Sequence, residues 1–164
     1  MIQPIHVYVA AGSNIEPAHN LRRALNALRE VYGPVEVSPA YRNRAVGFEG
    51  ADFINLVVGF ITTQTPAQVR ECLQAVEARC GRPRDAPRWA PRSMDLDILL
   101  YGAQVSQEPG MILPRPDLVR RAYMLKPLTD LAPDLPHPTL GRTMAQLWQD
   151  LAPAGHELVP VQLD

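Results

Sequence analysis

Two aspartates stand two positions apart at the start of the run DLDILLY, which spans residues 95–101. Side chains alternate between the two faces of a strand, so this run predicts one face with Asp95, Asp97, Leu99 and Tyr101 and another with Leu96, Ile98 and Leu100. Neighbouring carboxylates repel each other and are stabilised by a cation between them. The pair favours a bound divalent metal, Mg²⁺, with the solvated face of an edge strand as the alternative.

A cationic loop precedes this run. Arg82, Arg84, Arg88 and Arg92 lie within eleven residues, and three prolines among them exclude a helix. Guanidinium groups keep their charge and bind phosphate oxygens through planar pairs of donors. The arginines and aspartates together predict a site for a polyphosphate that is carried by a metal.

The whole chain limits the possible partners. It has 164 residues, of which 46% are hydrophobic and 20% charged, and this favours one globular domain over residues 1–164. The net charge of −1 gives no general attraction for polyanions, so any phosphate site would be a local feature. No secretion signal or membrane-length segment is evident, and Cys72 and Cys80 lie too far apart on a predicted helix to form a disulfide. These features favour a cytoplasmic protein, with neither nucleic acid nor a membrane as a partner.

The first half of the chain predicts strands that alternate with helices. Strands are expected over residues 5–10, 35–41 and 53–63 and from Asp95 to about Gly102, with a Gly12-Ser13-Asn14 turn after the first. One helix ends at Gly33. A second begins with the capping box Thr65-Pro66-Ala67-Gln68 and buries Val69, Leu73, Val76 and Cys80.

The second half predicts short helical segments over 117–123, 127–131 and 143–151. The order βαββαβ predicts an α+β, ferredoxin-like core. Its helices would cover one face of an antiparallel sheet and the C-terminal segments the other, which gives a three-layer α/β/α arrangement.

Two further features allow two interpretations each. Asn55 lies in an apolar strand and needs partners, which are either backbone groups or the edge of a ligand heterocycle. The Gly12-Ser13-Asn14 segment is either an ordinary turn and cap or an anion site formed by backbone amides.

Several blocks together resemble the 6-hydroxymethyl-7,8-dihydropterin pyrophosphokinase family over about residues 5–151. The blocks are Gly12-Ser13-Asn14, Phe53-Ile54-Asn55, the string from Arg88 to Asp97 (RWAPRSMDLD), Leu113-Pro114, and the segment from Arg121 to Leu128 (RAYMLKPL). The resemblance implies an ATP-dependent enzyme of folate biosynthesis. It would transfer the β,γ-pyrophosphoryl group of ATP to the pterin hydroxymethyl oxygen and release AMP.

The resemblance also implies residue roles. Asp95 and Asp97 would hold two Mg²⁺ ions. These two aspartates, together with Arg82 and Arg92, would be the catalytic residues. The ATP-binding set would be Gln74, Glu77, Arg84, Trp89, Ile98, Arg115 and Arg121, with Trp89 on a loop that closes over the substrates. The pterin-binding set would be Val46, Phe53, Asn55 and Tyr123.

This sequence departs from the family pattern at Arg115, where a histidine is usual, and at Tyr123, where phenylalanine is usual. An alternative is therefore a divergent pterin- or nucleotide-binding relative with altered substrate or lost activity. An RNA-recognition module is disfavoured because the chain has no aromatic run of the kind that stacks bases. A monomer with small-molecule substrates is the expected state.

Overall fold

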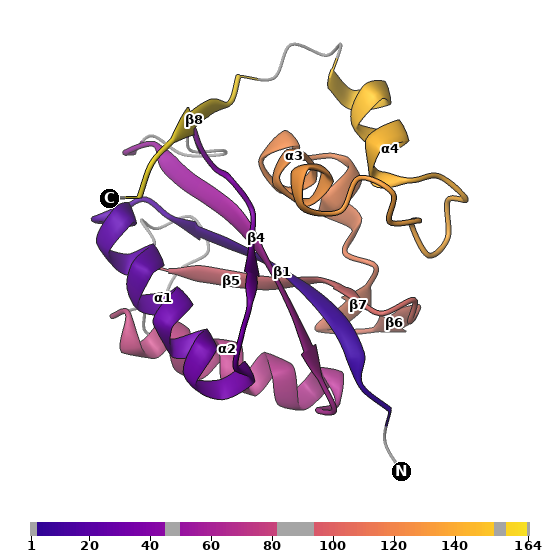
Figure 1. Cartoon of the computed structure of the whole chain (residues 1–164), viewed down its shortest axis with the longest axis horizontal. Helices are drawn as coiled ribbons and strands as arrows, with labels where there is room; N and C mark the ends of the chain where they lie inside the picture. Colours follow the sequence, from indigo (N-terminus) through magenta and orange to yellow (C-terminus); the bar gives the residue numbers. More distant parts are fainter. Residues whose placement is uncertain (1–2, 45–49, 82–93, 153–156, 164) are drawn as a thin grey trace.

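The computed structural model describes residues 3–44, 50–81, 94–152 and 157–163. It is a mixed α/β fold with a six-stranded antiparallel sheet between two groups of helices (Figure 1). The strands of this sheet are β1 (Ile5–Ser13), β2 (Glu36–Val37), β3 (Ala40–Asn43), β4 (Phe53–Thr62), β5 (Asp95–Tyr101) and β8 (Val159–Val161). A separate hairpin consists of β6 (Ser106–Glu108) and β7 (Met111–Leu113).

The described helices follow the predicted order, with different bounds in the second half. They are α1 (Pro17–Tyr32), α2 (Pro66–Arg79), the 3₁₀ turn η1 (Pro116–Val119), α3 (Ala122–Leu131) and α4 (Met144–Leu151). The capping box that opens α2 is confirmed, since Thr65 accepts from the Gln68 backbone and the Gln68 side chain accepts from Thr65. None of the helices described is both long and apolar enough to cross a membrane.

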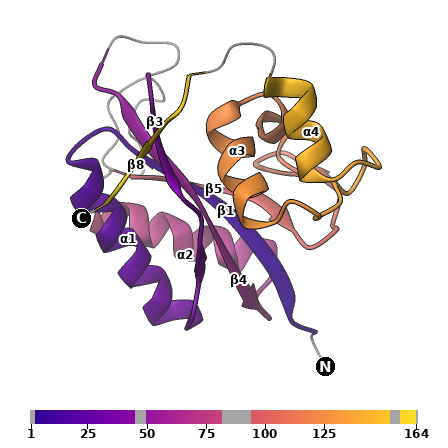
Figure 2. The same cartoon turned by 45° about the horizontal axis from the view of Figure 1, so that its top comes forward.

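The sheet has the order β5-β1-β4-β3-β8, and β2 also pairs with β4. The predicted strand over residues 35–41 is therefore wrong as one piece. Pro39 lacks a backbone donor and interrupts it, while the Ser38 hydroxyl accepts from Val57 N at 2.8 Å in place of a ladder bond. Figure 2 shows β8, a strand that the sequence analysis did not predict, lying beside β3.

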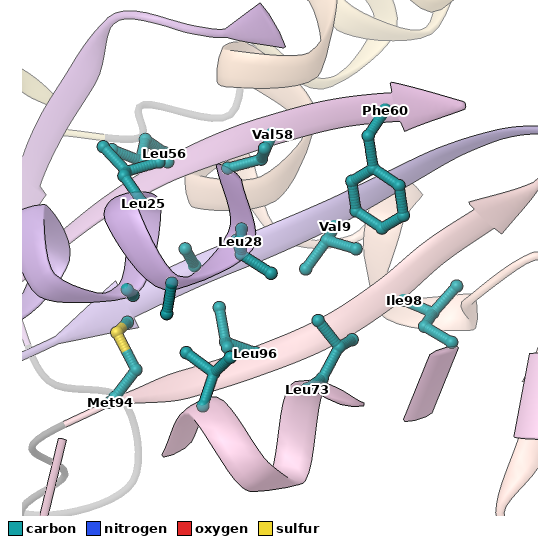
Figure 3. Close-up of a cluster of buried hydrophobic side chains, with 14 of the residues drawn as sticks. Val9, Leu25, Leu28, Leu56, Val58, Phe60, Leu73, Met94, Leu96 and Ile98 are labelled. Carbon is teal, nitrogen blue, oxygen red and sulfur yellow. The ribbon is translucent and has the colours of Figure 1, made fainter. Parts of the chain in front are cut away.

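One face of the sheet packs against α1 and α2 (Figure 3). Fully buried Leu28 and nearly fully buried Leu73 reach this first core from the two helices, and Phe60 stacks on Tyr32 with ring centroids 3.9 Å apart. The predicted stripe of α2 is confirmed, because all four of its residues are buried. Both cysteines are free thiols, as their spacing predicted.

The other face packs against α3, α4 and η1, which lie on the opposite side of the sheet from α1 and α2 (Figures 1 and 2). The separate helices predicted over 117–123 and 127–131 are wrong, because α3 is continuous through Pro127. Proline removes one helical hydrogen bond, but the burial of Leu125 and Leu128 in this second core offsets that cost.

A bulge changes the alternation of β5. Val9 of β1 lies opposite Ile98, whereas Tyr8 lies opposite Leu100, so Leu99 is an extra residue in β5. Leu100 consequently packs in the second core and Tyr101 in the first. The predicted faces of residues 95–101 are therefore confirmed as far as Leu99 and wrong for Leu100 and Tyr101.

Candidate active site

A row of paired residues crosses four strands of the sheet. Gly12 of β1 lies opposite both Asp95 of β5 and Asn55 of β4, and Asn55 lies opposite Tyr41 of β3. Directly paired residues project to the same face, so this cross-sheet row lies on the side of α3. The predicted turn at Gly12-Ser13-Asn14 is wrong in its first two residues, which continue β1.

Asp95 and Asp97 project from the same face of β5, with Leu96 and Ile98 buried in the first core behind them. Both aspartates are half-buried, and the Asp97 side chain is 25% exposed. Their carboxylate oxygens are the ligands that Mg²⁺ prefers. Within the described ranges no three His, Cys, Asp or Glu side chains cluster as a metal site. A pair still fits Mg²⁺, which commonly uses one or two carboxylates together with substrate phosphates.

Arg115 brings a guanidinium group to this pair. Its Nη1 lies 3.5 Å from Asp97 Oδ1, and its Nη2 lies 4.0 Å from Asp117 Oδ2. The backbone of Arg115 donates to Leu99 O at 3.0 Å, which fixes the residue beside the bulge of β5. The predicted site residues Asp97 and Arg115 are thus in contact, although they are far apart in the sequence.

The start of α3 adds Arg121 and Tyr123. Arg121 is exposed and is the residue immediately before α3. Burial raises the pKa of the Tyr123 phenol, and the charges of Asp117, Asp95 and Asp97 raise it further against the opposing effect of Arg121. The raised pKa keeps the phenol protonated at neutral pH, so its hydroxyl can donate a hydrogen bond.

Asn55 occupies the middle of the cross-sheet row and is only 8% exposed. Its Nδ2 donates to Asn43 Oδ1 at 2.5 Å, so its partner is a side chain and not the backbone. A Cβ at position 12 would lie only 2.3 Å from Asn55 Oδ1, so the glycine is what leaves room for the Asn55 amide. Phe53, two residues earlier on β4, is half-buried and lies opposite Asn43.

The remaining described candidates lie on or toward the other face of β5. Glu77 of α2 accepts a 2.8 Å hydrogen bond from Leu96 N, and Gln74 is half-buried one turn earlier. Ile98 is 8% exposed and belongs to the first core. Because β5 is an outer strand of the sheet, these residues and the aspartates flank the same edge.

Five predicted site residues lie outside the described residues: Val46, Arg82, Arg84, Trp89 and Arg92. Two described residues at the site, Asn43 and Asp117, escaped the sequence analysis, and Gly12 was predicted only as part of a turn or anion site. Asn43 holds Asn55, Asp117 lies next to Arg115, and Gly12 makes room for the Asn55 amide. Of Asn43 and Asp117, only Asn43 could have been found from the sequence, because it lies two residues after Tyr41 and would share its face if the predicted strand continued.

A mixed α/β fold with two carboxylates beside guanidinium groups is typical of enzymes that bind a phosphate-bearing substrate. The family model of 7,8-dihydro-6-hydroxymethylpterin-pyrophosphokinase matches residues 8–133. The chain belongs to this family.

Relatives in other organisms agree with this assignment. The 2-amino-4-hydroxy-6-hydroxymethyldihydropteridine pyrophosphokinase of Pseudomonas aeruginosa is 40% identical over 98% of this chain and 99% of its own length. The enzyme of the same name from Methylorubrum extorquens is 38% identical over 93% and 97%. Both comparisons extend over nearly the whole of each chain.

Solved structures support the fold. The crystal structure of wild-type Plasmodium falciparum HPPK-DHPS superimposes with a TM-score of 0.68 at 13% identity. The match covers 90% of this chain and 45% of the other, so this chain spans less than half of that protein.

Proposed function

We propose that this chain transfers the β,γ-pyrophosphoryl group of ATP to the hydroxymethyl oxygen of 6-hydroxymethyl-7,8-dihydropterin, with AMP as the second product. The observation that carries the proposal is the placement of Asp95 and Asp97 on the same sheet face as Asn55, with Arg115 in contact with Asp97. Groups suited to bind phosphate and a heterocycle thereby lie on one face, which supports the proposal. The near full-length relationship to the Pseudomonas aeruginosa enzyme supports the same reaction.

Asp95 and Asp97 would hold two Mg²⁺ ions on the ATP phosphates. When bound, these ions supply charge neutralisation for the oxygens that gain negative charge as the β-phosphorus is attacked. The protein positions the reacting groups and stabilises charge, so it needs no covalent nucleophile.

The nucleotide would bind along the outer edge of β5. Arg115 and Arg121 would contact phosphates from the α3 side, together with the predicted residues Arg82, Arg84, Trp89 and Arg92. Gln74, Glu77 and Ile98 flank the same edge from the α2 side, which suits them to the rest of the nucleotide. The Glu77 carboxylate already accepts from Leu96 N, so that contact would help fix its position for the nucleotide.

The pterin would bind over the middle of the cross-sheet row. An amide offers both a donor and an acceptor, which is the complement of a pterin edge, and Asn43 fixes the amide of Asn55 in one orientation. Phe53, Tyr123 and the predicted residue Val46 would supply apolar and aromatic walls. The Tyr123 hydroxyl adds a donor that phenylalanine would lack.

We also propose that the core is ferredoxin-like and that residues 1–164 form one domain, active as a cytoplasmic monomer. The strand order β5-β1-β4-β3, with α1 and α2 on one face, supports the ferredoxin-like assignment. Sedimentation of the purified protein tests the monomer.

The direct test incubates the protein with Mg-ATP and 6-hydroxymethyl-7,8-dihydropterin and separates the products. AMP and the pterin pyrophosphate are expected in equal amounts. ADP would indicate ordinary kinase chemistry, and neither nucleotide product would contradict the proposal. Omission of the pterin is the control for hydrolysis of ATP.

A further inference from the structure

Arg115 is held between two carboxylates without a close ion pair to either. Its Nη1 lies 3.5 Å from Asp97 Oδ1 and its Nη2 lies 4.0 Å from Asp117 Oδ2, both longer than a charge-assisted hydrogen bond. Its Nε is buried and has no hydrogen-bond partner in the described part of the chain. The guanidinium therefore has donors left for a further anion.

The backbone around Arg115 is fixed more firmly than its side chain. Arg115 N donates to Leu99 O at 3.0 Å, and Arg115 O accepts from Leu118 N at 3.1 Å at the start of η1. The side chain is 32% exposed, so its end remains accessible to a ligand. A small movement of the guanidinium can exchange partners without any change in the backbone.

The charges lead to competition at Asp97. A guanidinium group and a divalent cation repel each other, and the repulsion is strong at the few ångströms that separate ligands of one carboxylate. While Arg115 contacts Asp97, the aspartates are a poorer site for a free metal ion. A phosphate chain would draw Arg115 away because it offers several anionic oxygens.

We propose that Arg115 is a positioning residue that acts as a counter-ion of Asp97 in the nucleotide-free protein and moves to a phosphate when ATP binds. This inference rests on the proposed function. It predicts that Arg115 weakens the binding of free metal and strengthens the dependence of metal binding on nucleotide. By linkage, bound metal then strengthens nucleotide binding by the same factor as bound nucleotide strengthens metal binding.

The test measures Mn²⁺ binding by electron paramagnetic resonance, with and without a non-hydrolysable ATP analogue, and no turnover is involved. In the absence of nucleotide, Arg115→Gln should bind Mn²⁺ about fivefold more tightly than the unchanged protein. The tightening of Mn²⁺ binding by the ATP analogue should fall by about the same factor. Arg115→Lys keeps the charge and should stay close to the unchanged protein in both measurements.

Arg120→Gln is the matched control, since Arg120 is exposed, lies on the same segment and carries the same charge. Its Mn²⁺ affinity should change less than twofold, which separates the local contact from net charge. Equal or weaker Mn²⁺ binding by a folded Arg115→Gln protein would overturn the proposal, as would tighter binding by Arg115→Lys. Thermal melts of all variants confirm that each is folded.

The Mn²⁺ measurements depend on the nucleotide site of the proposed function but not on its reaction, so the two can fail separately. If the unchanged protein forms no AMP but the Mn²⁺ results hold, the proposed function fails and the role of Arg115 stands. If AMP forms and Arg115→Gln leaves Mn²⁺ binding unaltered, the proposed function stands and the role of Arg115 fails.

Discussion

The two faces of the sheet differ in the side chains that they carry. The face under α1 and α2 is apolar along its length, from Met94 and Leu96 to Phe60. The face under α3 and α4 is apolar at one end, where Tyr8 and Leu100 pack, and carries Asp95, Asp97 and Asn55 at the other. The same strands thus bury an apolar face on one side and, in the proposed function, carry binding groups at one end of the other.

The alternation of side chains makes this division possible. In β4, Ile54, Leu56 and Val58 enter the first core, while Asn55 projects to the opposite side. A substitution in the first core should therefore change folding, whereas a substitution of Asp95, Asp97 or Asn55 at the polar end of the other face should change catalysis. Four variants test that separation, beginning with those expected to change most.

The strongest test on the functional face is Asp97→Asn. It keeps the shape of the side chain but removes the charge that a metal and Arg115 require, so kcat should fall about 100-fold or more, equivalent to roughly 3 kcal/mol. The melting temperature should change by only a few degrees. Steady-state AMP formation is measured with Asp134→Asn, an exposed residue, as the control. A rate close to normal at ordinary Mg²⁺ concentrations would remove Asp97 from the site.

The matching test on the apolar face is Leu28→Ala. Leu28 is fully buried in the first core, and the cavity left by alanine should lower the free energy of unfolding by about 2–5 kcal/mol. Urea denaturation measures this loss, and kcat per folded molecule should be unchanged. Leu140→Ala, at a side chain that is 48% exposed, is the control. A large fall in kcat of the folded protein would contradict the separation of the two faces.

Gly12→Ala tests the cross-sheet row. The new Cβ would approach Asn55 Oδ1 to 2.3 Å and displace the amide, so the KM for the pterin should rise about tenfold, or ~1.4 kcal/mol. The same substitution should have little further effect when Asn55 is already alanine. Additive effects of the two changes would show that Gly12 acts through something other than Asn55.

Tyr41→Phe gives the smallest expected change. The Tyr41 hydroxyl donates to Asp130, which also accepts from Lys126 at 2.8 Å, so loss of one bond should cost about 1 kcal/mol of stability. Burial and Asp130 raise the pKa of Tyr41 to about 12 from 10.0. The unfolded chain therefore loses its phenolic proton first, and stability falls as the pH rises from about 10 to 12.

The stability difference between the unchanged protein and Tyr41→Phe should therefore be full at neutral pH and shrink over that range. Urea denaturation at several pH values measures it. A difference that grows with pH would show that the sign of the assigned pKa shift is wrong.

Local patterns in the sequence were sufficient for much of the fold. The capping box before α2, the end of α1 before Gly33 and the buried stripe of α2 all depend on residues within a few positions of one another. The same holds for the placement of Asp95 and Asp97 on one side of β5, because strand alternation is a local property.

Other features depended on contacts between distant segments. The bulge at Leu99 is set by pairing with β1, and the continuity of α3 through Pro127 depends on packing against the sheet. The strand β8 exists because β3 offers it an unpaired edge. No window of the sequence contains these partners.

Local spacing and residue type were thus enough to predict the βαββαβ order of the first half, the family and which side chains are capable of the chemistry. Which of those side chains meet depends on tertiary contacts. The fold placed Arg115 beside Asp97, Asn43 on Asn55 and Gly12 under the same amide. Local patterns miss these contacts because strand register is fixed by packing across the whole sheet, where a shift of one residue moves every side chain to the other face.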